Sequence, residues 1–372
     1  MATRGRLWYL DHLRAAMIVL VIFHHTAVTY GGAGSWYYSE AQTALPPRVL
    51  LTMFTGWNQA FFMGLLFFLS GYFTVPSHLR KGPGPYLRDR LIRFGIPLVV
   101  YVWAIEPVVA FMLQGAPRLG FAGFYVHNLA APDLGPMWFV EALLIFDVIF
   151  VAVAAAWPRV LRAREAAFPG PGKLLGFAVG LGLFAFCVRL VLPAATHQLL
   201  QLQLGYFPQY VAMFALGVAA ERQGWLRGAI PWAAEHRARG FIWAALAFEL
   251  PLLIVGTAGR PDVTAFYGGW HWQALGYALW EPFVCVGMGV WLLAAGRRRL
   301  DRAGPVWRFL SDQSYTAYII HPLVLVGVAL AWRGVAAEAL VKFLVTGTVA
   351  AAVAFGLAWA IRRVKATRVV LG

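Results

Sequence analysis

The sequence predicts an all-α integral membrane protein with about ten transmembrane helices. Of its 372 residues, 60% are hydrophobic and 13% are charged, and the mean hydropathy is +0.66. So apolar a chain has too few polar side chains to cover a soluble core. Its apolar windows also meet the criterion of roughly 20 residues for crossing a bilayer. These windows lie near residues 13–31, 49–75, 94–113, 136–157, 174–193, 204–220, 240–257, 272–295, 314–332 and 340–361.

Basic residues in alternate loops predict the orientation of these helices. Most of the 31 Lys and Arg residues form six groups, which come before the first window and after the second, fourth, sixth, eighth and tenth. The other loops carry only Arg48, Arg118, Arg260 and Arg333. By the positive-inside rule, both termini are expected in the cytoplasm. The net charge of +15 does not indicate a nucleic-acid partner, because the charges fall between apolar segments and not on one soluble face.

Each window is bounded by Pro, Gly or charge, and the whole of residues 1–372 is expected to form a single transmembrane domain. The apolar run after a cationic start could also be a cleavable signal peptide. Asp11, Arg14 and two histidines interrupt that run, and nine further windows follow, which argues against cleavage. The two cysteines, Cys187 and Cys285, lie inside apolar segments, so neither a disulfide framework nor a cysteine-based zinc site is expected.

The first window carries Arg14 and His25, and a titratable side chain inside a membrane helix usually has a function. Eleven residues advance a helix by about 16 Å and bring both side chains to one face. Asp11 lies three residues before Arg14 and can pair with its guanidinium. His24 points about 100° away from that face. The window therefore predicts a line of polar groups through the lipid.

Six further stretches make the pattern specific. They are Tyr9-Leu10-Asp11-His12-Leu13-Arg14, His24-His25, Phe67-Phe68-Leu69-Ser70-Gly71-Tyr72-Phe73, Arg90-Leu91-Ile92-Arg93 with Pro97, Met137-Trp138-Phe139-Val140-Glu141-Ala142-Leu143-Leu144 and Ser314-Tyr315-Thr316-Ala317-Tyr318-Ile319-Ile320-His321-Pro322. In order and spacing, over nearly the entire chain, they resemble the acyltransferase-3 family of integral-membrane acyltransferases. The first and fifth stretches resemble its glucan-modifying, glucan succinyltransferase-like branch. The family's catalytic signature of Arg or Lys, ten residues, then His is matched by Arg14 and His25.

Acyl transfer to a hydroxyl needs a base for the hydroxyl proton and a group that holds the developing oxyanion. We expect His25 to be the base, since burial favours the unprotonated imidazole that this role requires. The alternative is a core histidine that forms a hydrogen bond across helices. Arg14 is expected to bind donor phosphate or to position the donor, oriented by Asp11. Its alternative is an anchor that reaches the headgroups at the cytoplasmic boundary.

Two further catalytic candidates lie on later helices. His321 and Ser314 are seven residues apart and share a helix face with Tyr318. The resemblance implies that they line the same cavity, while a hydrogen-bonded set that stabilises the bundle is the alternative. Glu141 could orient His25 or bind the acceptor sugar, or it could be an interfacial carboxylate beside Trp138.

The expected donor site consists of Arg88, Arg90 and Arg93, because guanidinium groups bind phosphate bidentately. These arginines could also serve only to set the topology. Ser70 beside Gly71 is expected to be a close helix contact and not a nucleophile. The loop of residues 31–48, with Trp36, Tyr37, Tyr38 and Glu40, has side chains that stack on sugars or sit at an interface.

The sequence and the resemblance together indicate a multi-pass enzyme of the bacterial inner membrane. It would move a short acyl group, acetyl or succinyl, from cytoplasmic acyl-coenzyme A (acyl-CoA) to a hydroxyl of an extracytoplasmic carbohydrate or glycan. No metal is expected. A secondary transporter or flippase that uses the same buried polar path is the alternative, although no internal repeat is evident. A non-catalytic partner of a glycan-export system is a third possibility.

Overall fold

The chain folds into membrane-length helices. The computed structural model describes residues 6–40, 44–114, 120–128, 132–258 and 263–371, so Arg4, Arg118 and Arg260 lie outside the described residues. Within those ranges the secondary structure is helical, with no strand, and nine helices are long and apolar enough to cross a membrane. They are Trp8–Thr29 (α1), Leu45–Lys81 (α2), Pro83–Leu113 (α3 to α5), Gly135–Ala156 (with α7), Pro171–Arg189 (α8), Trp232–Gly256 (α10), Trp272–Arg299 (α11), Pro305–Ala331 (α12) and Ala339–Ile361 (α13). The predicted all-α class is confirmed for these residues.

The sixth expected span is the one that is not among these nine helices. Residues 204–220 were expected to cross the membrane, and the structure forms α9 there, Phe207–Gln223, with 17 residues. Such a helix is about 25 Å long, less than the hydrocarbon thickness of about 30 Å. A single 3-10 turn, Leu204–Tyr206, precedes it. Hydropathy does not distinguish this turn from the helix, which is why the predicted window begins at residue 204 and not at Phe207.

The described chain forms two compact units, each assembled from three separate stretches. Unit 1 comprises Met1–Met17, Gly56–Arg80 and Val153–Arg308. Unit 2 comprises Ile18–Thr55, Lys81–Ala152 and Phe309–Gly372. Helices α1, α2, α7 and α12 each contribute residues to both units.

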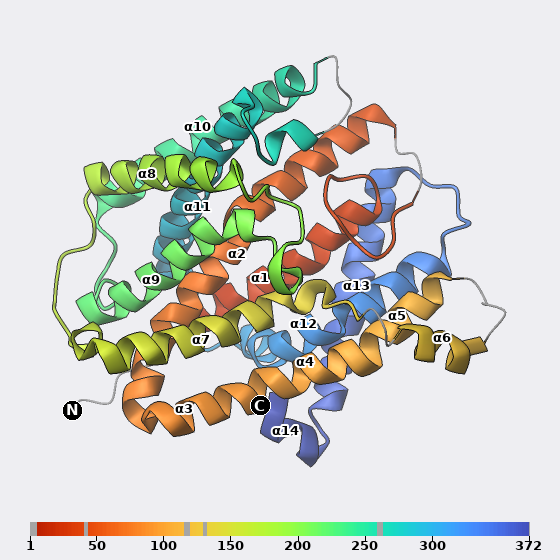
Figure 1. Ribbon diagram of the computed structural model, residues 1–372, viewed down its shortest axis with the longest axis horizontal. Coiled ribbons are helices and arrows are strands. Elements are labelled where there is room, and N and C mark those ends of the chain that lie inside the picture. Colours follow the sequence, from red (N-terminus) through yellow and green to blue (C-terminus); the bar gives the residue numbers. More distant parts are fainter. Residues whose placement is uncertain (1–5, 41–43, 115–119, 129–131, 259–262, 372) are drawn as a thin grey trace. The chain divides into compact units, whose positions relative to one another are not determined.

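In unit 1, helices α8, α10 and α11 pack side by side (Figure 1). Small residues allow the close approach: a Cβ added to Gly182 of α8 would lie 2.9 Å from the carbonyl oxygen of Ala278 in α11. The indole of Trp280 donates from Nε1 to the carbonyl of Ala245 in α10 at 3.0 Å. Large apolar side chains such as Phe184 and Trp243 remain exposed on α8 and α10, as expected for surfaces that face lipid.

Helices α2 and α9 approach until their backbones touch. A Cβ on Gly71 would lie 2.1 Å from the carbonyl oxygen of Phe214, and a Cβ on Gly217 would lie 2.0 Å from that of Phe68. Reciprocal glycines of this kind permit tight helix packing in membranes. The close helix contact expected at Ser70-Gly71 is therefore present.

A buried ion pair joins α8 to α11. Arg189 Nη2 lies 2.5 Å from Glu281 Oε2, and both side chains are almost completely buried. Arg189 also donates from Nε to the carbonyl of Gly205 at 3.0 Å. Two aromatic rings, those of Tyr206 and Tyr277, lie against the guanidinium. A charge inside the membrane is thereby neutralised and solvated by the protein itself.

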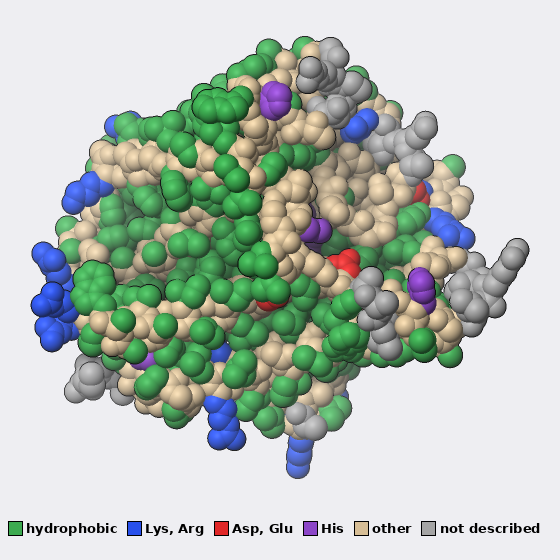
Figure 2. Space-filling model, in the orientation of Figure 1, with side chains coloured by type: hydrophobic (Ala, Val, Ile, Leu, Met, Phe, Trp, Pro, Cys, Tyr) green, Lys and Arg blue, Asp and Glu red, His purple; other side chains and the backbone are tan. Residues whose placement is uncertain are grey.

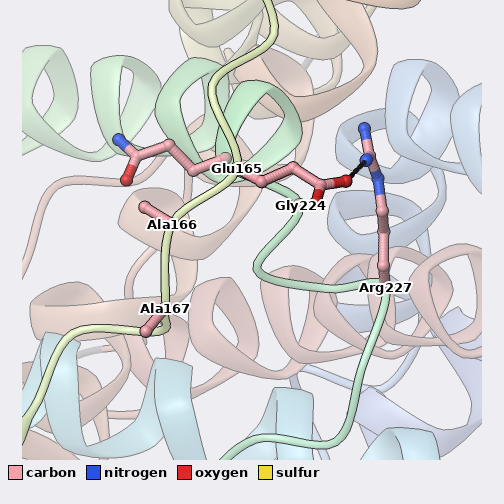
Figure 3. A pocket seen from close by; sticks show the side chains of 6 residues that line it. Glu165, Ala166, Ala167, Gly224 and Arg227 are labelled. Atoms are coloured by element: carbon pink, nitrogen blue, oxygen red, sulfur yellow. Dashed lines mark hydrogen bonds and ion pairs between the residues drawn. The ribbon is translucent and has the colours of Figure 1, made fainter.

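Two arginines in the last turns of α9 and α11 donate hydrogen bonds to backbone carbonyls of unit 1. Arg222 donates to the carbonyls of Arg159 and Arg162, and Arg297 donates to those of Leu226 and Arg227. Lys and Arg side chains gather beside the end of α9 (Figure 2). A surface hollow nearby is bordered by the ion pair of Glu165 with Arg227 at 2.9 Å (Figure 3). It contains none of the predicted site residues.

In unit 2, the span Pro83–Leu113 is interrupted twice by π-helical turns. It runs as α3 (Pro83–Arg90), η1 (Leu91–Gly95), α4 (Ile96–Val100), η2 (Tyr101–Ile105) and α5 (Glu106–Leu113). Each π turn ends two residues before a proline, Pro97 or Pro107. Proline lacks an N–H and its ring clashes with the carbonyl four residues earlier, so the helix widens ahead of it. The remaining elements are α6 (Gly120–Asn128), α7 (Trp138–Ala156), α13 (Ala339–Ile361) and α14 (Lys365–Leu371).

The glycine contact predicts a destabilising substitution. Gly217→Ala should lower the thermal stability of the detergent-solubilised protein by about 1–3 kcal/mol, because a methyl group cannot fit against the Phe68 carbonyl. Gly240→Ala in α10 is the matched control, since its Cβ would have open space within 4 Å. That change should be neutral or stabilise by up to about 1 kcal/mol. Equal melting temperatures for the two variants would argue against the close contact.

The expected orientation can be tested by cysteine labelling. In a chain with Cys187 and Cys285 replaced by Ala, cysteines at the exposed positions Ser35 and Ala336 should react with an impermeant thiol reagent from outside the cell. Cysteines at Gly228 and Ala303, also exposed, should react only after the membrane is opened. Gly34, Gly82 and Gly120 are avoided because their positive φ angles disfavour a side chain. The reverse labelling pattern would invert the topology.

Candidate active site

Three aromatic rings from separate segments of unit 2 form the candidate site. The imidazole of His25 in α1 stacks on the indole of Trp36, with centroids 3.8 Å apart and planes 17° apart. The imidazole of His321 in α12 lies 5.4 Å from that of His25 and 5.7 Å from the Trp36 ring, within 16° of parallel to both. We call His25, Trp36 and His321 the ring cluster.

The proton positions on His321 follow from its contacts. Its Nδ1 lies 2.5 Å from the carbonyl oxygen of Tyr318, and a carbonyl can only accept, so Nδ1 carries the hydrogen. In the neutral ring, Nε2 then keeps its lone pair. The side chain is fully buried, and Nε2 has no hydrogen-bond partner among the described residues. His321 therefore presents a proton-accepting nitrogen inside the protein.

His25 and Trp36 also keep polar atoms without partners. Nδ1 of His25 and Nε1 of Trp36 are both buried and form no hydrogen bond to the part of the chain that the structure describes. An unpaired buried donor or acceptor is costly, and such groups mark sites where a ligand supplies the missing bond. The ring of His24 meets that of His25 edge to face, 5.3 Å away, so the two histidines present different ring faces.

The segment that carries Trp36 is held at both ends. The amide of Glu40 donates to the carbonyl of Thr29 at 2.8 Å, and Lys342 Nζ lies 2.9 and 2.8 Å from the two carboxylate oxygens of Glu40. The hydroxyls of Tyr37 and Tyr101 share a hydrogen bond of 2.9 Å. We refer to residues 30–40 as the tryptophan segment.

Gly135 makes the contact between these tyrosines possible. Its φ of +46° is disfavoured for other residues, and an added Cβ would lie 2.0 Å from the Tyr37 hydroxyl. Burial, together with the nearby Asp133, raises the pKa of Tyr37 far above its ordinary value. The phenol therefore stays neutral and keeps its hydrogen bond at any physiological pH.

Glu141 and Ser314, predicted to lie near His25, make different contacts. Oε2 of Glu141 is buried and has no hydrogen-bond partner among the described residues, His25 included. Ser314 donates to the carbonyl of Ser311 in its own helix at 2.9 Å. The hydroxyl of Tyr318 is also engaged, with the carbonyl of Pro136. Of these three side chains, only Glu141 is left with an unsatisfied polar atom.

The predicted pair at the start of α1 is present. Arg14 Nη2 lies 3.0 Å from Asp11 Oδ1, and Arg6 Nε lies 2.8 Å from Asp11 Oδ2. The Arg14 side chain is 41% exposed, so it is accessible to an anionic ligand. Helix α1 is unbroken from Trp8 to Thr29 and carries both Arg14 and His25.

The three predicted donor-site arginines differ in their surroundings. Arg90 Nε lies 3.2 Å from Asp147 Oδ2, and its guanidinium packs over the Tyr86 and Phe94 rings. Tyr86 also donates to Asp147, which ties α3 to α7. Arg88 and Arg93 are exposed, with the Arg93 guanidinium 5.9 Å from the Tyr315 ring centroid. Accessible guanidinium groups are thus found at Arg88 and Arg93.

The sequence interpretation did not place Trp36 against His25. The signal available was the aromatic Trp36-Tyr37-Tyr38 run directly after the helix that ends in His24-His25, which was interpreted only as sugar-binding or interfacial. The described residues contain no group of three or more His, Cys, Asp and Glu side chains arranged to hold a metal ion.

Comparison with known proteins identifies the family. The family model described as "Acyltransferase domain", that of the acyltransferase-3 family, matches residues 7–363. Proteins named "Glucans biosynthesis protein C" from Salmonella gallinarum and Salmonella paratyphi B are each 24% identical to this chain over 345 residues, which is 86% of this chain and 83% of theirs. No solved structure matches. The match over nearly the whole chain shows that this protein belongs to the acyltransferase-3 family and is a membrane O-acyltransferase.

Proposed function

We propose that this enzyme transfers a short acyl group from acyl-CoA, bound on the cytoplasmic side, to a hydroxyl of an extracytoplasmic glycan. The observation that carries the proposal is the ring cluster, which brings imidazoles of the membrane helices α1 and α12 together with the unpaired indole N–H of the tryptophan segment. The acceptor class is supported by the relatives named for glucan biosynthesis. Both the family and the apolar spans support a multi-pass protein, which we place in the bacterial inner membrane.

The chemistry needs one proton acceptor and one oxyanion donor. The acceptor hydroxyl attacks the thioester carbonyl, its O–H bond breaks and its proton passes to His25. A C–O bond forms, the C–S bond breaks, and the proton is then delivered to the departing thiolate of coenzyme A. The basic lone pair of a neutral imidazole lies in the ring plane, so the stacking of Trp36 on a face of His25 does not cover it.

Trp36 is the oxyanion donor in this proposal. Its Nε1–H is buried without a partner among the described residues and belongs to the ring that touches His25. A preorganised donor aimed at a developing oxyanion is worth about 10²–10³ in rate. The tryptophan segment is anchored at Glu40 and Tyr37, so the indole is held in place before substrate binds.

The donor phosphates are assigned to Arg88 and Arg93, whose side chains are accessible. Arg90 supports them by fixing α3 against α7 through Asp147. Arg14, oriented by Asp11, is accessible on the helix that carries His25 and would bind the donor. Guanidinium groups suit this task because they bind phosphate with two parallel hydrogen bonds.

Transfer by the purified protein tests the proposal. The full-length protein in lipid vesicles would be given acetyl-CoA or succinyl-CoA and a glucan oligosaccharide, and the products examined by mass spectrometry. The expected result is an acetyl or succinyl ester on the glucan together with free coenzyme A. Movement of glucan or donor across the vesicle membrane without ester formation or donor hydrolysis would favour a transporter instead.

The base assignment predicts the effect of one substitution. His25→Ala should lower acyl transfer by about 10²–10⁴-fold while melting temperature stays near that of the wild type. His24→Ala is the control, because its ring meets His25 only edge to face, and its loss should be much smaller. Initial rates at saturating donor would provide the comparison, and an active His25→Ala enzyme would remove His25 from the mechanism.

The oxyanion assignment can be tested with two substitutions that distinguish the stacking of the Trp36 ring from the hydrogen bond of its N–H group. Trp36→Phe keeps an aromatic ring on His25 and removes the donor, so kcat should fall by about 10²-fold with little change in KM. Trp36→Ala should lose at least as much, since it also frees the His25 ring. A Trp36→Phe enzyme with wild-type kcat would reassign Trp36 to packing.

A further inference from the structure

A proline follows His321 directly in the interior of α12. In an uninterrupted α-helix, the N–H of residue 322 would donate to the carbonyl of Tyr318, four residues earlier. Pro322 has no N–H, so that carbonyl lacks its helical donor. The atom that takes its place is Nδ1 of His321, 2.5 Å from the Tyr318 oxygen.

Two other prolines in unit 2 show the same compensation. The carbonyl four residues before Pro97 belongs to Arg93 and accepts from the Tyr315 hydroxyl at 2.7 Å. The carbonyl four residues before Pro107 belongs to Trp103 and accepts from the Tyr125 hydroxyl at 2.9 Å. A side-chain donor thus replaces the missing N–H in all three cases. Only in α12 is that donor an imidazole and part of the candidate active site.

We infer that Pro322 is a positioning residue that fixes the tautomer of His321. By freeing the Tyr318 carbonyl, it lets Nδ1 hold the hydrogen and leaves Nε2 as the proton-accepting nitrogen, beside His25 and Trp36. His321 then serves the same site as a second proton acceptor, poised before substrate arrives. The catalytic part of this inference rests on the proposed acyl transfer, whereas the tautomer itself does not.

Replacing the proline should separate helix stability from activity. Pro322→Ala restores an N–H that competes for the Tyr318 carbonyl, so His321 loses its fixed partner and the tautomer with hydrogen on Nε2 becomes populated. The same change removes an interior proline, so the melting temperature should hold or rise. Pro107→Ala is the matched control: it also restores an N–H, but the carbonyl concerned contacts Tyr125 and no histidine.

The experiment combines nitrogen NMR with kinetics on the full-length protein, labelled with ¹⁵N-histidine and reconstituted in lipid. His321→Gln identifies the His321 signals by their absence. Wild type and Pro107→Ala should show a protonated Nδ1 and a bare Nε2, and Pro322→Ala should show a mixture of tautomers. Transfer by Pro322→Ala should fall about tenfold in kcat, less than the 10²–10⁴-fold expected for removal of a base, with donor and acceptor KM unchanged.

Each outcome decides whether Pro322 positions His321 or serves only in helix packing. A hydrogen on Nε2 of His321 in the wild type, or an unchanged tautomer in Pro322→Ala, would overturn the inference. A shifted tautomer with full transfer activity would overturn its catalytic part. If the wild type transfers no acyl group at all, the proposed function fails, and the NMR comparison still decides whether Pro322 fixes the tautomer.

Discussion

A carbonyl freed inside a membrane helix must find its hydrogen-bond donor within the protein, because hydrocarbon offers none. Three prolines of unit 2, Pro97, Pro107 and Pro322, each free one carbonyl in this way. Tyrosine hydroxyls satisfy the first two and thereby tie one helix to another. The third is satisfied by His321, so the same constraint that joins helices elsewhere sets the chemistry of an imidazole in the candidate site. In the proposed mechanism, the hydrogen bonding of the helix backbone and the protonation of a site histidine are connected through one carbonyl.

Charged side chains in the apolar spans likewise find their partners within the protein. Arg189 pairs with Glu281, Arg90 with Asp147 and Lys342 with Glu40, each inside the compact unit to which both residues belong. A basic residue near lipid is therefore weak evidence for a ligand, since the protein needs such pairs to hold its own elements. Exposure distinguishes an arginine that is accessible to a ligand from one that holds the structure. Arg93 is exposed, whereas the side chain of Arg90 is 18% exposed and paired with a carboxylate.

Hydropathy and helix spacing predicted the features that are determined within one helix at a time. The helical class, nine of the spans and the pairing of Asp11 with Arg14 follow from composition and from positions three residues apart on one helix. The stacking of Trp36 on His25 could not be predicted in this way, because it depends on how a nonhelical segment folds back onto α1. Asp147 was missed as the partner of Arg90 because the two residues are 57 positions apart and neither periodicity nor charge pattern relates them. The start of α9 was placed too early because a 3-10 turn and an α-helix have the same hydropathy.

The anchoring of the tryptophan segment determines how an acceptor can reach His25. Lys342 has a side chain only 6% exposed and binds both oxygens of Glu40, so lifting the segment would leave a buried ammonium without its partner. Breaking a buried pair costs about 3–5 kcal/mol, and the Tyr37 hydrogen bond over Gly135 would be lost as well. Opening of the segment is thus an expensive first step for each turnover. The edges of the His25 and His321 rings carry the nitrogen lone pairs that the proposed reaction uses, and they keep their positions as long as the segment stays closed. The stacked geometry therefore favours a preassembled site over one that forms when the segment opens.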